Sequence, residues 1–488
     1  MSHVPFPMPL VPSPHFPYLS QLIMYFDRDD TIVALATAHG TAAIAVIRLS
    51  GPEAFSITES VFHNKIGKAK KISHFPTHTI HFGTIGEGEI PLDECLVSIF
   101  KGPTSFTGQD VVEISCHGSV FIQQQLVQLL IRYGARLAKP GEFSLRAFLN
   151  GKFDLSQAEA IADLIESQSA ASHQVALEQM RGGFSSKIKT LRENLLDFAS
   201  LIELELDFSE EDVEFANRDD LKKLLYTIQR LILRLVDSFE VGNVIKNGIP
   251  VVIVGKPNAG KSTLLNVLLE EERAIVSEIP GTTRDTIEDE ITIDGILFRF
   301  IDTAGLRDTT DAIESIGVSR AFEKVKQSAI VIYLFDVHEL SAGELKLNIE
   351  ELKKHITANG AQLVIVGNKI DKEDFNSIQK EFIDFEILFL SAKEKLYIDD
   401  LKVKLVSLFD NRTVNVTETI VTNARHVEAL RNTNNAIQRT IEGLNNNVPA
   451  DLIAQDIREA LHYLGMITGE ISSDDLLKNI FGRFCIGK

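Results

Sequence analysis

The spacing of hydrophobic positions along the chain changes once in the first half of the sequence. From Thr31 to about Asn150, short β-rich apolar runs, among them residues 43–49 and 111–115, alternate with Gly/Pro turns and a few helical stretches. From Lys152 to about Asn247 proline disappears, and apolar residues recur at helical spacing. The first pattern predicts an α+β domain and the second predicts long amphipathic helices.

The second half of the sequence shows two further patterns. Residues 249–410 alternate buried strands with helices, which is typical of a mostly parallel α/β sheet, and a helical pattern resumes over residues 417–480. The simplest interpretation is one all-α domain interrupted by an inserted α/β domain, in a multidomain α+β and α/β protein. The predicted boundaries are an N-terminal extension at 1–28, the α+β domain at 29–149, helical halves at 150–247 and 411–488, and the insert at 248–410.

Composition narrows the class of protein. The chain has 488 residues, of which 24% are charged and 44% hydrophobic, as in ordinary globular proteins. Its net charge of −19 argues against a nucleic-acid binder held by bulk electrostatics, although it allows a local basic patch. No apolar run has the length needed to span a bilayer, so we expect no membrane association.

Cysteine usage and the N-terminus indicate a cytoplasmic protein. Cys95, Cys116 and Cys485 are too widely spaced for a disulfide framework or a metal ladder, which fits a reducing compartment. The first 23 residues are rich in proline and aromatics and lack the features of signal and transit peptides. We interpret them as a disordered extension or a wrongly assigned start, with Met24 as the plausible first residue.

A glycine-rich loop follows the apolar run at residues 251–254. The segment Gly255-Lys-Pro-Asn-Ala-Gly-Lys-Ser262 fits GxxxxGK[ST] between a predicted strand and a predicted helix, which is the context that this phosphate-binding motif requires. Backbone N–H groups would cradle the phosphates, Lys261 would reach the β/γ oxygens, and the Ser262 hydroxyl would ligate Mg²⁺. The expected nucleotide contacts are Asn258, Ala259, Gly260, Lys261, Ser262 and Thr263.

Three later motifs indicate that the nucleotide is GTP. A carboxylate at Asp302 can reach the Mg²⁺ shell, and the Gly305 N–H can face the γ-phosphate. A carboxylate at Asp371 can accept two guanine donors that adenine lacks, and the Ser391 loop can close over the base. In this order and spacing, the motifs are a strong signal of GTP binding. Their predicted GTP contacts are Asp302, Thr303, Ala304, Gly305, Asn368, Lys369, Asp371, Ser391, Ala392 and Lys393.

The segment between the phosphate loop and Asp302 has the composition of a nucleotide-dependent switch. Thr282 and Thr283 lie in it, and one hydroxyl can bind Mg²⁺ only while the γ-phosphate is present. We expect Ser262 and Thr283 to be the Mg²⁺ ligands. Leu306 occupies the position where Ras-like enzymes carry the glutamine that orients water, so another residue must perform that task.

Together with these motifs, several other segments make the sequence resemble the MnmE (TrmE) family of tRNA-modification GTPases from about Asp30 to Lys488. The resemblance is carried by the phosphate-loop and guanine motifs and by five further segments: Ser105-Phe-Thr-Gly-Gln-Asp-Val-Val-Glu113, Lys139-Pro-Gly-Glu-Phe-Ser144, Arg146-Ala-Phe-Leu-Asn150, residues 154–165, and Phe484-Cys-Ile-Gly-Lys488. The Pro-Gly-Glu-Phe and terminal motifs are specific to the family, whereas the nucleotide motifs alone would indicate only a GTPase.

The resemblance implies a fold and an activity. The fold would be an N-terminal tetrahydrofolate-binding α+β domain and a helical domain interrupted by an inserted Ras-like G domain. The activity would be GTP hydrolysis together with addition of a carboxymethylaminomethyl (or aminomethyl) group at C5 of the wobble uridine of certain tRNAs. This work is shared with the FAD-dependent protein MnmG and uses 5,10-methylene- or 5-formyl-tetrahydrofolate. Potassium-dependent pairing of G domains in a homodimer would activate hydrolysis.

The resemblance also assigns roles to individual residues. It implies potassium ligands at Asn258, Ser277, Ile279 and Thr282, and a catalytic, water-positioning carboxylate at Glu314. It implies folate contacts at Arg48, Glu113, Lys152 and Lys488, and a candidate catalytic thiol at Cys485. Asn258 and Thr283 are also predicted to be catalytic. The switch residues expected to contact GTP are Ser277, Glu278, Ile279, Pro280, Gly281 and Thr282.

Two other classes of protein remain possible at this stage. A ribosome-assembly or signalling GTPase that acts as a binding switch would share the nucleotide motifs, but such proteins usually carry a basic RNA-binding module, which this sequence lacks. A folate-dependent aminomethyltransferase with a regulatory G domain is the other alternative. Loss of wobble-uridine modification on gene deletion would favour the tRNA-modifying enzyme.

Overall fold

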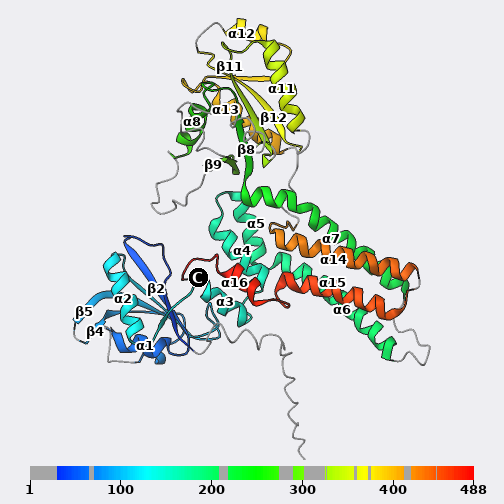
Figure 1. Cartoon of the computed structure of the whole chain (residues 1–488). Helices are drawn as coiled ribbons and strands as arrows, with labels where there is room; N and C mark the ends of the chain where they lie inside the picture. The colour runs from blue at the N-terminus through cyan, green and yellow to red at the C-terminus, as the bar shows by residue number, and fades with distance from the viewer. Residues whose placement is uncertain are drawn as a thin grey trace, which may run out of the picture. The chain divides into compact units, whose positions relative to one another are not determined.

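The computed structural model describes residues 30–64, 71–88, 90–207, 218–273, 289–301, 325, 327–356, 360–371, 375–410, 419–446 and 448–487. Packing divides the chain into two compact units (Figure 1). The first unit comprises Met1–Ala158 together with Ile471–Lys488, and the second comprises Glu159–Glu470. The C-terminal segment therefore packs with the N-terminal residues, whereas the predicted boundaries group it with the helical domain. The domain boundaries themselves remain a prediction.

The first unit is built on a seven-stranded sheet with strand order β3-β4-β5-β6-β2-β1-β7. All neighbouring strands pair antiparallel except β1 and β7, which are parallel. The strands are β1 (Ile32–Leu35), β2 (Ile44–Ser50), β3 (Phe62–Asn64), β4 (Thr79–Glu87), β5 (Ile90–Phe100), β6 (Val111–His117) and β7 (Arg136–Leu137), and the helical elements are α1 (Ala54–Val61), η2 (Ile72–His74), α2 (Val120–Arg132), α3 (Glu142–Leu149) and α16 (Asp474–Phe481).

Alternation of side chains along the strands explains the core of this unit. On β2, Ala45, Ile47 and Leu49 are fully buried at every second position, and they pack in one cluster with residues of α1 and α2. This arrangement confirms the α+β class that the sequence pattern predicts. It also places Arg48, which alternates with these residues, on the other face of the sheet.

Within the first unit, the C-terminal residues pack against the N-terminal residues at two glycines. A Cβ on Gly141, which has φ +66°, would come within 2.2 Å of the Phe481 carbonyl oxygen. A Cβ on Gly487, which has φ +103°, would come within 2.3 Å of the Leu35 carbonyl oxygen. Only glycine combines this conformation with such close backbone contact. Phe484 is buried whereas Ile486 is exposed, so Phe484 is the apolar anchor of the tail.

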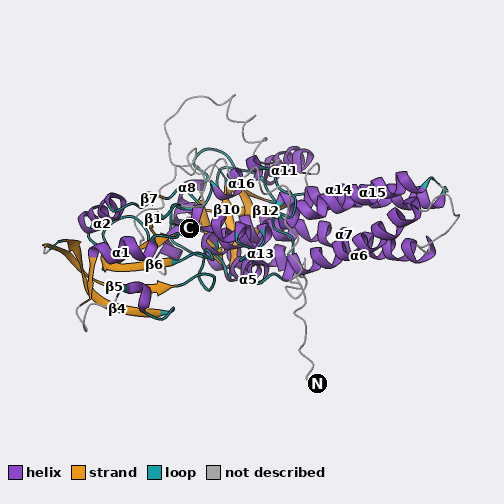
Figure 2. Cartoon of the chain, turned by 90° about the horizontal axis from the view of Figure 1, so that it is seen from below, coloured by secondary structure: helices purple, strands orange, loops and turns teal. Residues whose placement is uncertain are grey.

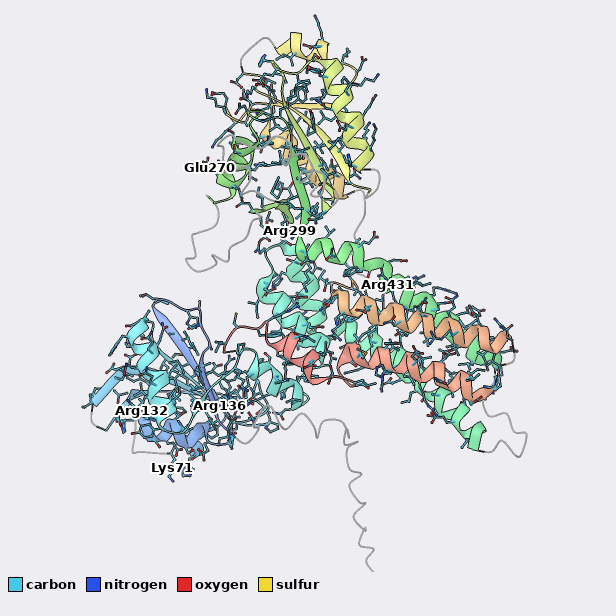
Figure 3. All side chains as sticks on the ribbon, in the orientation of Figure 1. Lys71, Arg132, Arg136, Glu270, Arg299 and Arg431 are labelled. Atoms are coloured by element: carbon cyan, nitrogen blue, oxygen red, sulfur yellow. The ribbon has the colours of Figure 1, made fainter. Side chains whose placement is uncertain are left out.

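A buried charge cluster fixes the Pro-Gly-Glu-Phe motif. The Glu142 carboxylate has no exposed surface, and it accepts hydrogen bonds from Arg136 at 2.6 Å, from Arg146 at 3.1 Å and from the Lys139 backbone N–H at 2.9 Å. Burial alone would raise the pKa of Glu142, but these donors outweigh it and the pKa is lowered. Asp30 completes the cluster by pairing with both arginines (Arg136 is labelled in Figure 3).

The helical part of the second unit contains segments from both sides of the insert. Helices α6, α7, α14 and α15 lie lengthwise beside one another (Figure 2), with α14 packed against α7 and α15, and α15 packed against α6. Within the described residues, no helix is both long and apolar enough to span a bilayer. The helices are α4 (Leu155–Glu166), which starts in the first unit, α5 (Ala170–Met180), α6 (Gly183–Asp207), α7 (Arg218–Asn247), α14 (Ala424–Asn445) and α15 (Ala450–Thr468).

The inserted part is a six-stranded sheet of order β13-β12-β11-β8-β10-β9, in which only the β9–β10 pair is antiparallel. Successive residues of β11 enter two different cores, so helices cover both faces: α8 and α13 on one, α11 and α12 on the other. This confirms the predicted, mostly parallel α/β sheet. The elements are β8 (Ile249–Val254), α8 (Lys261–Arg273), β9 (Asp289–Ile293), β10 (Ile296–Phe300), β11 (Ile330–Asp336), α11 (Ala342–Ile356), β12 (Gln362–Asn368), α12 (Phe375–Glu381), β13 (Ile387–Leu390) and α13 (Ile398–Asp410).

A second buried carboxylate joins helices that are distant in sequence. Glu159 of α4 accepts hydrogen bonds from Arg425 Nη2 at 2.8 Å and pairs with His426 Nε2 at 2.7 Å. Arg425 also donates to the Met466 carbonyl at 2.5 Å and the Ile467 carbonyl at 3.1 Å, at the end of α15. Burial opposes ionisation of Glu159, but His426 and Arg425 outweigh it and lower the pKa from 4.5 to about 2.

We expect Glu159→Gln to destabilise the helical domain at neutral pH. A lowered pKa in the folded state contributes stability that is complete above pH 4.5 and is lost as pH falls towards about 2. A shift of this size corresponds to about 3 kcal/mol. Chemical unfolding followed by circular dichroism should show a lower midpoint for the variant at pH 7 and a smaller difference from wild type at pH 3.

The matched control is Glu203→Gln, since Glu203 pairs with Arg458 on the exposed surface of the same bundle. Exposed pairs contribute about 0–1 kcal/mol, so this variant should unfold close to wild type. Equal effects of the two substitutions would contradict the importance of the buried pair.

Candidate functional site

The phosphate loop begins where β8 ends. A Cβ on Gly255 would lie 2.0 Å from the Leu334 carbonyl of the neighbouring strand β11, and a Cβ on Gly260, which has φ +97°, would lie 2.3 Å from the Asn368 side chain. A side chain at either position would clash, so glycine at both allows the loop to pass this close to β11 and Asn368 before it continues into α8. Its backbone N–H groups can then face an anion at a helix N-terminus. The structure therefore fits the predicted phosphate cradle.

Lys261 is the first residue of α8, and its ammonium group lies inside the loop. Its Nζ donates to the carbonyl oxygens of Gly255 and Lys256, each at 2.8 Å. Burial lowers the pKa of Lys261. The ammonium is therefore pre-positioned at the cradle, and phosphate oxygens would replace neutral carbonyls with a stronger, charge-assisted partner.

Asn368 connects the phosphate loop to the base-binding loop. Its Nδ2 donates to the Ala259 carbonyl at 2.8 Å, and its Oδ1 accepts from the Ala392 backbone N–H at 3.0 Å. The side chain is almost fully buried, so loss of either bond would leave a buried polar atom without compensation. Asn368 thus positions both loops, and its contact with the nucleotide stays a prediction.

The loop at residues 391–396, which is predicted to bind the base, is closed by two backbone hydrogen bonds between Ser391 and Leu396, at 3.1 and 3.0 Å. The Ser391 hydroxyl donates to Asp371 Oδ1 at 2.5 Å and accepts from the Glu394 N–H at 3.2 Å. This places Asp371 at the mouth of the loop, where its carboxylate can accept the N1–H and 2-amino donors of guanine. Lys393 is exposed and pairs with Glu394 at 3.3 Å.

Lys369, which follows Asn368 in the chain, makes a supporting contact that the sequence patterns did not predict. Lys369, which has φ +71°, pairs through Nζ with Asp336 Oδ2 at 2.6 Å, and the His338 backbone N–H donates to the other Asp336 oxygen at 3.0 Å. Asp336 is buried at the end of β11. An acidic residue that ends an apolar strand is the signal that could have indicated it.

The remaining nucleotide-site predictions divide into two groups. Asn258 has φ +62° and is exposed on the loop, Ser262 is partly buried, and Thr263 is exposed at the start of α8. The other predicted residues lie outside the described part of the chain, and so does Leu306. They are Ser277, Glu278, Ile279, Pro280, Gly281, Thr282, Thr283, Asp302, Thr303, Ala304, Gly305 and Glu314.

In the first unit, the predicted folate contacts Arg48 and Glu113 are cross-strand neighbours on β2 and β6. Arg48 Nε donates to Glu113 Oε1 at 2.8 Å, and Arg48 Nη1 donates to the Gly487 carbonyl at 3.1 Å. The guanidinium also lies 5.4 Å from the centre of the Phe106 ring. One arginine therefore joins the sheet, an aromatic loop residue and the C-terminal tail.

The other residues predicted for this site lie on adjacent segments. Lys152 Nζ donates to the Pro103 carbonyl at 2.7 Å, at the start of the loop that carries Phe106, and Phe106 lies 6.2 Å from Phe153. Cys485 is exposed, and its carbonyl accepts from the Gly141 N–H at 3.5 Å. Lys488 lies outside the described residues.

The parallel sheet, the phosphate loop at the end of β8 and the Asp371 loop together define a phosphate-loop GTPase. Two family models match the chain: "GTP-binding protein TrmE N-terminus" over residues 31–152, and "MnmE helical domain" over residues 155–485. The chain belongs to the MnmE family of tRNA-modification GTPases.

Two relatives support this assignment over nearly the whole length. The tRNA modification GTPase MnmE of Cytophaga hutchinsonii is 60% identical over 461 residues, which cover 94% of this chain and 98% of that protein. The protein of the same name from Flavobacterium psychrophilum is 57% identical over 462 residues, or 94% and 99% of the two chains. Among solved structures, Era in complex with MgGDPNP and nucleotides of 16S ribosomal RNA is 27% identical, with a TM-score of 0.25 over 38% of this chain and 66% of that chain.

We expect Asp371→Asn to weaken GTP binding and to admit xanthosine triphosphate, because an amide can donate to the xanthine 2-oxo group. Loss of the charge-assisted contact is worth about 1.5–3 kcal/mol, or roughly ten- to a hundredfold in affinity. Fluorescence titration with labelled nucleotides would measure both effects. Asp399→Asn, on the exposed start of α13, is the control. Unchanged GTP affinity in the Asp371 variant would contradict this role.

Proposed function

We propose that this protein hydrolyses GTP as part of a reaction that adds a carboxymethylaminomethyl or aminomethyl group to C5 of the wobble uridine of certain tRNAs. The observation that carries the proposal is the Arg48 centre. There, a family-specific C-terminal tail docks by backbone contacts beside the charged and aromatic residues of the N-terminal unit, in a chain that also holds a GTP site. A signalling GTPase that acts only as a switch would not need this second centre.

At the GTP site, we propose that Ser262 and Thr283 hold Mg²⁺ and that Asn258, with Ser277, Ile279 and Thr282, holds a potassium ion. The exposed position of Asn258 on the phosphate loop, with φ +62°, supports this, because an exposed amide oxygen can ligate a cation. A potassium ion there would supply the positive charge that an arginine finger supplies in other GTPases. Glu314 would orient the attacking water, since Leu306 cannot.

At the second site, we propose that Arg48, Glu113, Lys152 and Lys488 bind a tetrahydrofolate derivative, 5,10-methylene- or 5-formyl-tetrahydrofolate. The residues present fit such a ligand. A paired arginine and carboxylate offer donors and acceptors for a pterin ring, Phe106 offers an aromatic surface, and Lys152 offers a cation for a glutamate tail. When bound, the folate would supply the one-carbon unit. Cys485 is exposed beside this centre, where a thiol could take part in the chemistry.

We further propose that the protein works in the cytoplasm as a homodimer whose G domains pair in the presence of potassium, and that the FAD-dependent protein MnmG is its partner. The tRNA is the shared substrate. Because the protein carries a net charge of −19, tRNA binding must rely on a local basic patch or on the partner.

Potassium should raise the GTP hydrolysis rate strongly over sodium, and Asn258→Ala should remove the difference. The reason is the loss of one oxygen ligand at a site whose cation stabilises the transition-state charge. Hydrolysis assays in matched potassium and sodium chloride would measure the ratio, with Asn243→Ala as a control on the exposed face of α7. Equal wild-type rates in the two salts would contradict the potassium site.

Deleting residues 485–488 should abolish wobble-uridine modification while GTP hydrolysis stays within a few-fold of wild type, because the tail packs with the first unit and the GTP site lies in the second. Mass spectrometry of tRNA from cells carrying each variant measures the modification. Cys485→Ser is the finer test, since thiol chemistry requires loss of modification and simple packing does not. Joint loss of hydrolysis and folding would mean that the tail is only structural.

A further inference from the structure

The inserted α/β domain is joined to the helical domain by two chain connections. The incoming connection runs from the last turn of α7 through Gly248 into β8, and β8 leads directly to the phosphate loop. The outgoing chain returns at residues 419–423, before α14. Any rearrangement around the nucleotide that moves β8 must therefore reach the helical domain through the end of α7.

The last turn of α7 is held by an ion pair. Lys246 Nζ lies 2.8 Å from Asp163 Oδ1 of α4, and the two side chains are 28% and 13% exposed. Lys246 is two residues before Gly248, whose φ of +76° marks the end of the helix. The pair thus sits at the position where the incoming chain changes from helix to strand.

Asp163 and the buried Glu159 lie on the same face of α4, and Glu159 comes one turn before Asp163. Glu159 is fixed by Arg425 and His426 at the start of α14, and Arg425 is fixed in turn by carbonyl oxygens at the end of α15. Helix α4 is therefore anchored rigidly to the bundle at Glu159, and Asp163 extends that anchor to the end of α7. The surroundings differ, because Asp163 pairs with Lys246, whereas Glu159 pairs with both Arg425 and His426.

The outgoing chain is also held by hydrogen bonds, to α5 and to the C-terminal part of α7. Gln179 of α5 donates to the Ile420 carbonyl at 2.8 Å, and the Val421 N–H donates to the Ser238 hydroxyl of α7 at 3.1 Å. A Cβ on Gly242 would lie 2.0 Å from the Val421 carbonyl, so α7 and the outgoing chain touch through their backbones. Both connections of the insert are held side by side at the end of α7.

The Asp163–Lys246 pair also borders a cavity of about 450 Å³ within the second unit. Besides this pair, its lining includes Glu166 of α4 and Glu290 and Arg299 of the β9–β10 hairpin, and Arg299 lies where β10 approaches the end of α7 (Figure 3). The pair is therefore not enclosed by a close-packed core, and there is space beside it for the side chains to rearrange.

We propose that Asp163 and Lys246 are positioning residues that transmit the nucleotide state of the inserted domain, through β8 and the end of α7, to the tRNA-modification reaction. The inference rests on the proposed function, in which GTP hydrolysis and modification are coupled. Neither residue is among those proposed to bind the nucleotide or among those of the Arg48 centre. Their effect is on the coupling between the two activities, so hydrolysis by itself does not depend on them.

The test uses the full-length protein with MnmG and tRNA, and compares modification with GTP against modification with GDP. In Asp163→Asn and Lys246→Met, GTP hydrolysis and the unfolding temperature should stay near wild type, while the GTP/GDP ratio of modification should fall about five- to 150-fold, towards one. The reversed pair, Asp163→Lys with Lys246→Asp, should restore much of the ratio, because the ion pair is re-formed with opposite polarity.

The matched control is the exposed pair at the other end of α7, Asp220 and Lys223, which lie 3.0 Å apart. Asp220→Asn and Lys223→Met should leave every readout at the wild-type value. A wild-type ratio in the Asp163 and Lys246 variants would overturn the proposal. So would a joint fall of hydrolysis and unfolding temperature, since that is the result of a merely structural pair. A wild-type protein with a ratio of one would instead disprove the coupling in the proposed function.

Discussion

The close approach of α7 to the outgoing chain at Gly242 and Val421 is the contact on which the rest of the second unit depends. An inserted domain requires the chain to leave and re-enter the host domain at one place, and here the two segments meet with no room for a Cβ. Once they meet, α14 runs back along α7, and α15 returns along α14 and α6. The hydrophobic core then closes from residues on both sides of the insert, such as Ile232 and Leu430.

After the helical bundle, the chain ends in the first unit, to which Ile471–Lys488 belong. After α15 the chain reaches α16, which packs on α3, and the tail continues to Gly487 beside Leu35. The first unit is thus completed by the last residues of the sequence, and the helical bundle is likewise completed by helices that follow the insert. A chain arranged in this way gives the final residues a fixed position, and Arg48 uses that position by donating to the Gly487 carbonyl.

Sequence patterns predicted the local features well, because local features have local causes. The predicted strand at residues 251–254 lies within β8 (Ile249–Val254), because it is a short apolar run that ends at a turn residue. The phosphate loop followed from a motif in its required context. The bridging role of Asn368 did not follow, because its partner Ala259 is 109 residues away and only the parallel sheet brings them together. For the same reason, the pairing of Arg146 with Asp30, which is 116 residues away, could be identified only from the folded unit.

The two carboxylates of α4 show how neighbouring, similar residues can differ physically. Glu159 is surrounded by donors that outweigh burial and lower its pKa to about 2, so its charge and position are fixed at any ordinary pH. For Asp163, burial is the largest influence and the pKa is raised in spite of Lys246. An ionised Asp163 is therefore stabilised less than an ionised Glu159, and Lys246 is the largest source of that stabilisation. A carboxylate paired with both an arginine and a histidine anchors a helix, whereas one paired with a lysine at the edge of a cavity can respond when that lysine moves. The difference between a rigid anchor and a responsive contact thus arises within one turn of one helix.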